Sequence, residues 1–317
     1  MIINPVNLYV VLPCYNEEDV LPETSKRLLE LFDSMRKENL IDSLSRIVFV
    51  DDGSKDKTWE LISSLSTEYD EIYGIKLAKN AGHQNALLAG LMTVRNSCEC
   101  VISIDADLQD DIGAIPEMVK KYQEGCDVVY GVRSKRETDT FLKRTTAELF
   151  YKLMLGLGVN MVYNHADYRL MSERALNALS EFTEVNLFLR GMVPLVGYKS
   201  DTVYYERAER FAGESKYPLK KMLSFALNAI TSFSITPIRL ISALGASACI
   251  IAIIMAIYTL VQKFTGHTDS GWASIMMSIW FIGGVQLISL GLIGEYIGKM
   301  YKEVKHRPRY IIEEVRF

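Results

Sequence analysis

The chain has 317 residues, of which 49% are hydrophobic and 23% charged, with a net charge of −4 at pH 7. This length and composition exclude a disordered chain, a collagen-like repeat and a small disulfide-rich domain. The balance of charges gives no indication of a nucleic-acid partner. Five cysteines without a framework spacing and four scattered histidines indicate a reducing compartment rather than a disulfide scaffold or a zinc site.

Strand-like and helix-like patterns alternate over the first 200 residues. The β-rich runs are Leu8–Leu12, Arg46–Val50, Tyr73–Leu77, Val101–Ile104 and Val128–Tyr130. The helical stretches between them are Glu17–Asn39, Lys55–Ser66, Gln84–Ser97 and Ile112–Glu124. This alternation predicts an α/β domain with a mostly parallel sheet flanked by helices. Ligands of such sheets bind beyond the carboxyl ends of the strands, where we expect the chemistry.

Acidic turns follow several of these predicted strands. The first run is followed by Pro13–Glu18 and the second by Asp51–Thr58, and such turns, taken singly, more often cap helices. The fourth run is followed by Asp105 and Asp107, which would point the same way in an extended chain. Two such carboxylates suit a divalent cation, Mg²⁺ or Mn²⁺, whose other ligands are phosphate oxygens.

Several common nucleotide and metal motifs are missing from the sequence. It contains no Gly-x-x-x-x-Gly-Lys-Ser/Thr, no Gly-x-Gly-x-x-Gly and no His-Glu-x-x-His. An ATPase, a dinucleotide oxidoreductase and a zinc peptidase therefore have no support. The predicted cation is expected to bind the diphosphate of another kind of nucleotide.

Two long runs near the C-terminus contain no charged residue, 240–261 and 270–294. Each reaches the roughly 20 residues that a helix needs to cross a bilayer core of about 30 Å. Lysine and arginine are frequent before the first run and after the second, whereas the connecting loop has only Lys263. By the positive-inside rule this predicts a transmembrane hairpin with both ends cytoplasmic. Met1–Asn7 does not resemble a signal peptide, so the first domain is expected in the cytoplasm.

A helical stripe of apolar residues precedes the first run, from Leu219 to Phe233. With lysines off the stripe, it predicts an amphipathic helix on the cytoplasmic leaflet, and a core-facing helix is the alternative. The predicted organisation is a catalytic domain at 1–210, juxtamembrane helices at 211–236, two transmembrane helices within 237–298 and a cytoplasmic tail at 299–317. Gly294 and Gly298 allow close helix packing, which favours a homo-oligomer.

Several segments, in order, resemble the family 2 inverting glycosyltransferases with a GT-A fold: Val11–Glu17, Val50–Ser54 with Thr58, Lys79–Gln84 and Asp105–Asp110. Others resemble the polyprenyl-phosphate glycosyltransferases, relatives of dolichol-phosphate mannose synthase, and most of all the bacterial two-span bactoprenol glucosyltransferases: Gly131–Arg133, Asn164–Arg169, Gly213–Tyr217 and Arg307–Tyr310. The family's Asp-Pro-Pro-Glu appears here as Asp110–Gly113, a departure expected to affect a helix start more than catalysis.

The resemblance implies a role for each matching residue. A nucleotide sugar would be bound by Pro13, Tyr15, Glu17, Asp51, Asp52 and Asp105, and Mg²⁺ or Mn²⁺ by Asp107 and Gln109. The catalytic residues would be Asp105, Asp107, Asp167 and Arg133. The lipid phosphate would be bound by Arg133, Arg144, Arg169, Arg210, Ser215 and Lys216. His83 and His165 are expected to be structural hydrogen-bonding residues.

The implied reaction is transfer of a sugar to polyprenyl phosphate with inversion at the anomeric carbon. A phosphate monoester has a second pKa of about 6, so at pH 7 it is largely a dianion and already a nucleophile. It needs cations beside it to approach a negatively charged donor. The expected reaction moves glucose from UDP-glucose to undecaprenyl phosphate on the inner face of the bacterial plasma membrane, for later modification of a surface glycan such as O-antigen.

Other activities remain open at this point. The sugar could be N-acetylhexosamine, mannose or an aminoarabinose derivative. A processive polysaccharide synthase would be expected to have more spans and a Gln-x-x-Arg-Trp motif, which the chain lacks. A non-catalytic subunit that binds nucleotide sugar or lipid phosphate is the alternative from another class.

Overall fold

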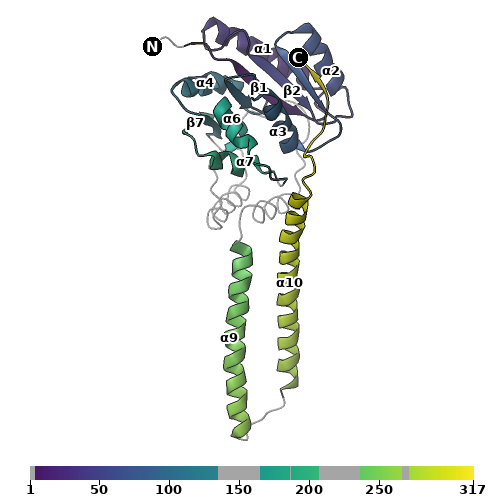
Figure 1. Ribbon diagram of the computed structural model, residues 1–317, viewed down its shortest axis with the longest axis vertical. Helices are drawn as coiled ribbons and strands as arrows, with labels where there is room; N and C mark the ends of the chain where they lie inside the picture. Colours follow the sequence, from purple (N-terminus) through teal and green to yellow (C-terminus); the bar gives the residue numbers. More distant parts are fainter. Residues whose placement is uncertain (1–3, 135–164, 186, 207–235, 266–270) are drawn as a thin grey trace. The chain divides into compact units, whose positions relative to one another are not determined.

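The computed structural model describes residues 4–134, 165–185, 187–206, 236–265 and 271–317 (Figure 1). The chain divides into two compact units. The first comprises Met1–Lys152, Asn160–Pro218 and Arg307–Phe317, and the second comprises Leu153–Val159 and Leu219–His306. Of the tail predicted at 299–317, residues 307–317 thus belong to the first unit and 299–306 to the second.

The first unit is built on an eight-stranded sheet in the order β7-β5-β6-β4-β1-β2-β3-β8. The strands are β1 (Leu8–Cys14), β2 (Arg46–Asp51), β3 (Ile72–Leu77), β4 (Cys100–Ser103), β5 (Val128–Arg133), β6 (His165–Ser172), β7 (Ser200–Tyr205) and β8 (Ile312–Arg316). β6 and β8 run antiparallel to their neighbours, and the other pairs are parallel. The predicted mixed, mostly parallel α/β sheet of the GT-A type is confirmed.

Helices connect these strands and cover both faces of the sheet (Figure 1). They are α1 (Leu21–Lys37), α2 (Thr58–Glu68), α3 (His83–Val94), α4 (Ile115–Gln123), α6 (Glu173–Ser180) and α7 (Leu189–Met192), with 3₁₀ turns η1 (Ile112–Ala114) and η2 (Val193–Val196). α1, α2 and α4 share one hydrophobic core with alternate residues of the strands. α3 lies on the opposite face, where Gly90 comes so close to Val11 and Val50 that an added Cβ would lie 2.5 and 2.7 Å from their methyl groups.

The predicted helices begin too early, because the loops after β1 and β2 are longer than the pattern indicated. α1 begins at Leu21 and α2 at Thr58, not at Glu17 and Lys55. The polar residues between are bonded across the two loops: the Asn16 amide donates to Ser54 Oγ at 3.0 Å, and the Glu17 amide to Thr58 Oγ1 at 2.9 Å. These side chains therefore fix two neighbouring loops at the carboxyl ends of β1 and β2.

The second unit contains helices α9 (Thr236–Phe264) and α10 (Trp272–Val304). They include the two charge-free runs, apart from two residues at the start of the second. Among the residues that the structure describes, one helical stretch, Phe281–Val304, is long and apolar enough to cross a membrane, and none of its apolar window is buried. Ile253 and Leu287 are 61% and 72% exposed. The two-span hairpin stays a prediction, and the amphipathic helix expected within 211–236 lies almost wholly outside the described residues.

Gly53 occupies a position that only glycine fits. Its φ is +65°, and an added Cβ would lie 2.6 Å from the Asn80 nitrogen and 2.7 Å from the Lys79 carbonyl carbon. Both neighbours are backbone atoms, which cannot rotate away. The close approach brings the loop after β2 against the loop that precedes α3.

We expect Gly53→Ala to lower the free energy of unfolding by more than 2 kcal/mol, roughly the cost of a left-handed alanine plus a backbone clash. Gly197→Ala is the matched control, because Gly197 has a similar φ of +75° but an added Cβ would lie 3.8 Å from its nearest neighbour, the Leu195 carbonyl oxygen. The control should lose only about 1–2 kcal/mol. Unfolding of both full-length variants in neutral detergent, followed by near-UV circular dichroism, measures the difference. Equal losses would contradict the steric argument.

Candidate active site

A pocket of about 340 Å³ opens at the carboxyl ends of β1 and β2. Four residues predicted to bind the nucleotide sugar line it together: Pro13, Tyr15, Glu17 and Asp52. The loop before α3 and the first turn of α3 complete the wall with Asn80, Gly82, His83 and Ala86. Tyr15 is 41% exposed, so its ring offers an accessible apolar face to a planar group.

Asp51 is the last residue of β2 and Asp52 follows it; both are buried and accept hydrogen bonds from different loops. Asp52 accepts hydrogen bonds from the Ala81 amide at 2.6 Å and the Gly82 amide at 3.0 Å, and so holds the loop before α3. Asp51 accepts one from the Ser54 amide at 3.2 Å, whereas its Oδ2 is buried with no hydrogen-bond partner among the described residues. Burial raises the pKa of both carboxyl groups. Asp51 does not line the pocket, and Asp52 forms part of its wall.

Asp105 and Asp107 lie beyond the end of β4, and a turn begins at Ala106 between them. β4 ends at Ser103, and Leu108 has a φ of +55°. The expectation that alternation along a strand would align the two carboxylates therefore does not apply. Asp107 Oδ1 accepts a hydrogen bond from the Gln109 amide at 3.2 Å. Asp105 Oδ1 is buried without a hydrogen-bond partner in the described part of the chain, and burial raises the pKa of this carboxyl to about 6.

A buried charge cluster lies beside this turn, centred on Asp167 of β6. Arg169 Nη2 donates to Asp167 Oδ1, and Arg190 Nη2 donates to Asp167 Oδ2 at 3.0 Å. The Asp167 side chain is only 5% exposed. Burial alone would raise its pKa, but Arg190, His83 and Arg169 together hold the pKa well below the usual range. Asp167 is therefore ionised at neutral pH.

His83 joins the two acidic groups at the pocket. Its Nε2 lies 3.4 Å from Asp105 Oδ1 and 3.7 Å from Asp167 Oδ2. Burial lowers the pKa of this imidazole, but Asp167 and Asp105 outweigh that effect and raise it. Sequence reasoning gave His83 only a structural role. Its place after β3, at the sheet edge where β1, β2 and β4 also end, was the signal that could have identified it.

A second polar cluster holds Arg133 at the end of β5. Arg133 Nη2 donates to Asp110 Oδ1 at 3.1 Å, and Arg133 Nε donates to the Tyr205 hydroxyl at 3.2 Å. The Tyr205 hydroxyl donates to the same Asp110 oxygen at 2.6 Å. The three side chains thus form a closed triangle that links β5, β7 and the turn after Asp107. Neither Asp110 nor Tyr205 was singled out as a site residue from the sequence.

Of the remaining residues predicted to bind the lipid phosphate, Arg169 is described by the structure and four are not. Arg169 is 1% exposed, and its Nη1 donates to the Leu189 carbonyl at 3.2 Å, so this side chain is enclosed rather than presented to a ligand. This differs from the expected direct contact with a lipid phosphate, because the guanidinium is already committed to Asp167. Arg144, Arg210, Ser215 and Lys216 lie outside the described residues.

The described residues fit a divalent cation shared with a phosphorylated ligand. They contain no group of three or more His, Cys, Asp or Glu side chains that could hold an ion by themselves. A Mg²⁺-type site with one or two protein carboxylates and substrate phosphates needs no such group. Asp107 and Gln109 carry the carboxylate and amide oxygens that such an ion prefers, and the nearby Asp105 Oδ1 is buried without a hydrogen-bond partner among the described residues.

Acidic turns and a pocket lie at the carboxyl ends of the central parallel strands, which is where α/β enzymes with open sheets bind their ligands. Residues 9–180 match the family described as Glycosyl transferase family 2, and residues 236–300 match the GtrB C-terminal hairpin. The chain belongs to glycosyl transferase family 2 and is a glycosyltransferase.

Curated relatives extend the similarity over nearly the whole chain. The chain is 56% identical over 306 residues to the glycosyltransferase YkoT of Bacillus subtilis (strain 168), covering 96% of this chain and 91% of that one. It is 39% identical over 310 residues to the bactoprenol glucosyl transferase of Shigella phage SfV, covering 97% and 98%. Among solved structures, glucosyl-3-phosphoglycerate synthase from Mycobacterium tuberculosis is similar at 19% identity and a TM-score of 0.45, covering 71% and 78%.

The raised pKa of Asp105 predicts a pH dependence of stability. Between pH 4 and 6 the folded chain retains a proton that an unfolded aspartate, with a pKa near 3.9, has lost. The stability from this group is therefore present at pH 4 and is lost as the pH rises to about 6. Relative to the parent, the free energy of unfolding of Asp105→Asn should increase by about 1 kcal/mol between pH 4 and 6. This figure allows for the Asp105 side chain being 34% exposed. Thermal unfolding in EDTA from pH 4 to 7 tests this, and a constant difference would contradict it.

The triangle of Arg133, Asp110 and Tyr205 predicts that removal of the Tyr205 hydroxyl destabilises the fold. Tyr205→Phe should lower the free energy of unfolding by about 1–3 kcal/mol, because it leaves the buried Asp110 carboxylate with one donor fewer. Tyr204→Phe is the matched control, since Tyr204 is the preceding residue of β7 and is 67% exposed. The midpoint of thermal unfolding should fall for Tyr205→Phe alone. Equal midpoints for the two variants would show that the triangle does not contribute to stability.

Proposed function

We propose that the chain transfers glucose from UDP-glucose to undecaprenyl phosphate at the cytoplasmic face of the bacterial plasma membrane. The observation that carries the proposal is the combination of a nucleotide-type pocket at the sheet edge with a C-terminal pair of long apolar helices. Such a pair gives a soluble domain access to an acceptor that never leaves the bilayer. The relatives named bactoprenol glucosyl transferase, matched over 97% of this chain, support glucose and a polyprenyl lipid.

The nucleotide sugar is proposed to bind across the 340 Å³ pocket. Tyr15 would contact the base, Pro13, Glu17 and the wall formed by Asp52 would enclose the nucleoside, and Asp51 would act from behind that wall. Asp105 would face the ribose or the donor sugar. Asp107 and Gln109 would hold Mg²⁺ or Mn²⁺, which, when bound, offsets the negative charge of the leaving diphosphate.

Arg133 is proposed to receive the lipid phosphate. The Asp110 carboxylate and the Tyr205 hydroxyl fix its guanidinium by 3.1 and 3.2 Å hydrogen bonds. A cation held in this way lowers the repulsion between two phosphorylated substrates without losing further side-chain entropy on binding. The phosphate dianion then attacks the anomeric carbon from the face opposite the leaving group, which inverts the configuration.

Asp167 is proposed to act at the sugar as an ionised, rigidly held carboxylate. Arg169 is proposed to position Asp167 rather than to contact phosphate, because its side chain is buried and bonded to that carboxylate. His83 extends the same cluster to Asp105. Arg144, Arg210, Ser215 and Lys216 remain proposed ligands of the lipid phosphate on the basis of the family resemblance.

The membrane arrangement is also a proposal. α9 and α10 would form a two-span hairpin with the catalytic domain and both termini in the cytoplasm, and 211–236 would lie on the leaflet. The exposed apolar side chains of α9 and α10 support a lipid environment, since soluble surfaces rarely carry continuous apolar area of this kind. Gly294 and Gly298 support a homo-oligomer, because an added Cβ at either would meet nothing within 4 Å and small residues let a second helix approach closely.

The direct test is transfer of radiolabelled glucose from UDP-glucose to undecaprenyl phosphate by the purified full-length chain with Mn²⁺ or Mg²⁺. We expect a lipid-linked product whose formation falls at least about 100-fold in Asp107→Asn, because that variant loses a charged ligand of the cation. Asp111→Asn is the matched control, since Asp111 is exposed and caps only η1. Undiminished transfer by Asp107→Asn would contradict the assigned site. If the chain instead transferred sugar from GDP-mannose or UDP-N-acetylglucosamine and not from UDP-glucose, the proposed sugar would be mannose or N-acetylglucosamine rather than glucose.

A further inference from the structure

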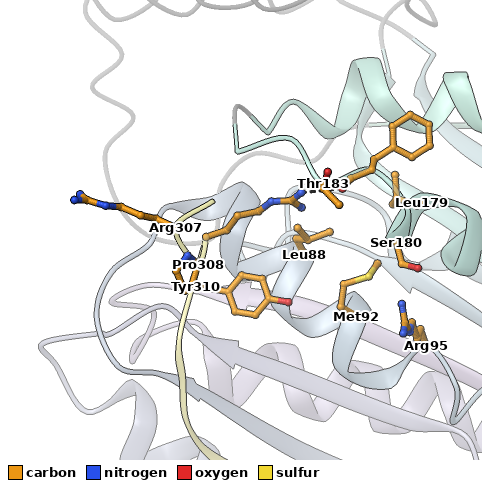
Figure 2. A pocket seen from close by; sticks show the side chains of 11 residues that line it. Leu88, Met92, Arg95, Leu179, Ser180, Thr183, Arg307, Pro308 and Tyr310 are labelled. Carbon is orange, nitrogen blue, oxygen red and sulfur yellow. Dashed lines mark hydrogen bonds between the residues drawn. The ribbon is translucent and has the colours of Figure 1, made fainter. Parts of the chain in front are cut away.

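A second cavity, of about 480 Å³, lies within the first unit and apart from the pocket described above (Figure 2). Its walls come from α3, from the end of α6 with the residues that follow it, and from the C-terminal segment 307–310. The two cavities have no lining residue in common. Along α3, Arg95 lies twelve residues beyond His83, a distance of about 18 Å at 1.5 Å per residue. The second cavity is therefore separate from the proposed reaction centre.

The lining combines apolar walls with positive charge. Leu88, Met92, Leu179 and Phe182 supply apolar surface, and Arg95 and Arg309 supply guanidinium groups. Among the residues that the structure describes, no aspartate or glutamate lines the cavity. Figure 2 shows Leu88, Met92 and Tyr310 around the same space, whereas the Arg307 side chain extends away from it. The chemistry calls for a ligand with an anionic group joined to an apolar part.

Two arginines, Arg95 and Arg309, line this cavity and differ in their partners. Arg309 Nη2 donates to the Phe182 carbonyl at 2.8 Å, which fixes the guanidinium and engages one of its five N–H donors. Arg95 has no hydrogen bond or ion pair with any residue in the described ranges. Tyr310 lines the same cavity, where burial raises its pKa and the positive charges of Arg309 and Arg95 oppose that shift. Two guanidinium groups and a phenol hydroxyl therefore belong to the polar part of the cavity lining.

The place of segment 307–310 directly after α10 favours one kind of anionic ligand over another. In the sequence, only Lys305 and His306 separate the end of α10 from Arg307, the first residue of the C-terminal segment that lines the cavity. A free phosphate ion would leave the apolar walls without a partner. A phospholipid supplies a phosphodiester for the arginines together with glycerol and acyl carbons for the leucines and Phe182.

We propose that this cavity binds the headgroup of an anionic phospholipid of the cytoplasmic leaflet, with its phosphate at Arg95 and Arg309. The proposal rests on the proposed function in one respect, the placement of α10 in the membrane. It does not depend on which sugar is transferred or on transfer itself. Bound lipid would join α3, α6 and the segment that leads from α10 to β8.

Native mass spectrometry of the full-length chain in neutral detergent tests the proposal by resolving single lipid-binding events. The probes are dioleoyl phosphatidylglycerol, dioleoyl phosphatidylcholine and inorganic phosphate. We expect the first phosphatidylglycerol to bind at least about fivefold more tightly than phosphatidylcholine, in keeping with charge-assisted hydrogen bonds to two guanidinium groups. This preference should disappear in the double variant Arg95→Gln/Arg309→Gln. Arg27→Gln, which removes an exposed arginine on α1, should retain it.

A second variant guards against a folding defect in the double variant. Thr183 lines the cavity and is exposed, so Thr183→Glu adds a carboxylate at the rim while keeping both arginines. It should also abolish the preference for phosphatidylglycerol. A preference that persists in both variants would overturn the proposal, because the lipid would then bind elsewhere, for example along the helices. Inorganic phosphate binding with the same sensitivity to both variants would overturn the lipid assignment in favour of a free anion. Loss of glucose transfer with an intact lipid preference would mark failure of the proposed function alone.

Discussion

A carboxylate removed from water keeps its charge only when cations surround it, and the site depends on how Asp167 meets this condition. Arg169 and Arg190 both donate to it, from β6 and from α7, and His83 approaches it from α3. Removing any one of these cations would leave the buried Asp167 charge poorly compensated, which typically lowers the free energy of unfolding by about 3–5 kcal/mol. The cluster therefore ties three elements from distant parts of the sequence into one fixed arrangement beside Asp105.

Hydrogen bonds to buried polar groups also hold the other loops at this edge of the sheet in place. Asp52 binds the amides of Ala81 and Gly82, and Ser54 and Thr58 bind the backbone of the first loop. Each loop after a central strand is thus held by side chains from its neighbour. A pocket with such walls is largely formed before a ligand arrives, so less binding free energy is lost in ordering it.

The sequence was informative where burial follows a local pattern. β1 to β5 are short, mostly apolar runs and were predicted, whereas β6 was not, because Asp167 and Arg169 give it a polar appearance that their mutual ion pair removes in the fold. β8 was missed because it is an edge strand with charged residues, Glu313, Glu314 and Arg316. The motif residues Pro13, Tyr15, Glu17 and Asp52 were predicted as a set and do line one pocket. The position of His83 after β3 could have identified it, although its partner Asp167 lies 84 positions away in the sequence. Tyr205 could not be assigned, since its partner Asp110 lies 95 positions away.

The last strand has a consequence for how the protein is assembled. β8 pairs with β3, and Lys76 of β3 forms an ion pair with Glu313 at 3.2 Å. The other seven strands precede α9 and α10 in the sequence, and β8 follows both. During synthesis the ribosome therefore makes the two apolar helices before the residues that cover the edge of β3. An unpaired edge invites pairing with other chains, so a protein released before its final residues are made would carry both helices and an open sheet.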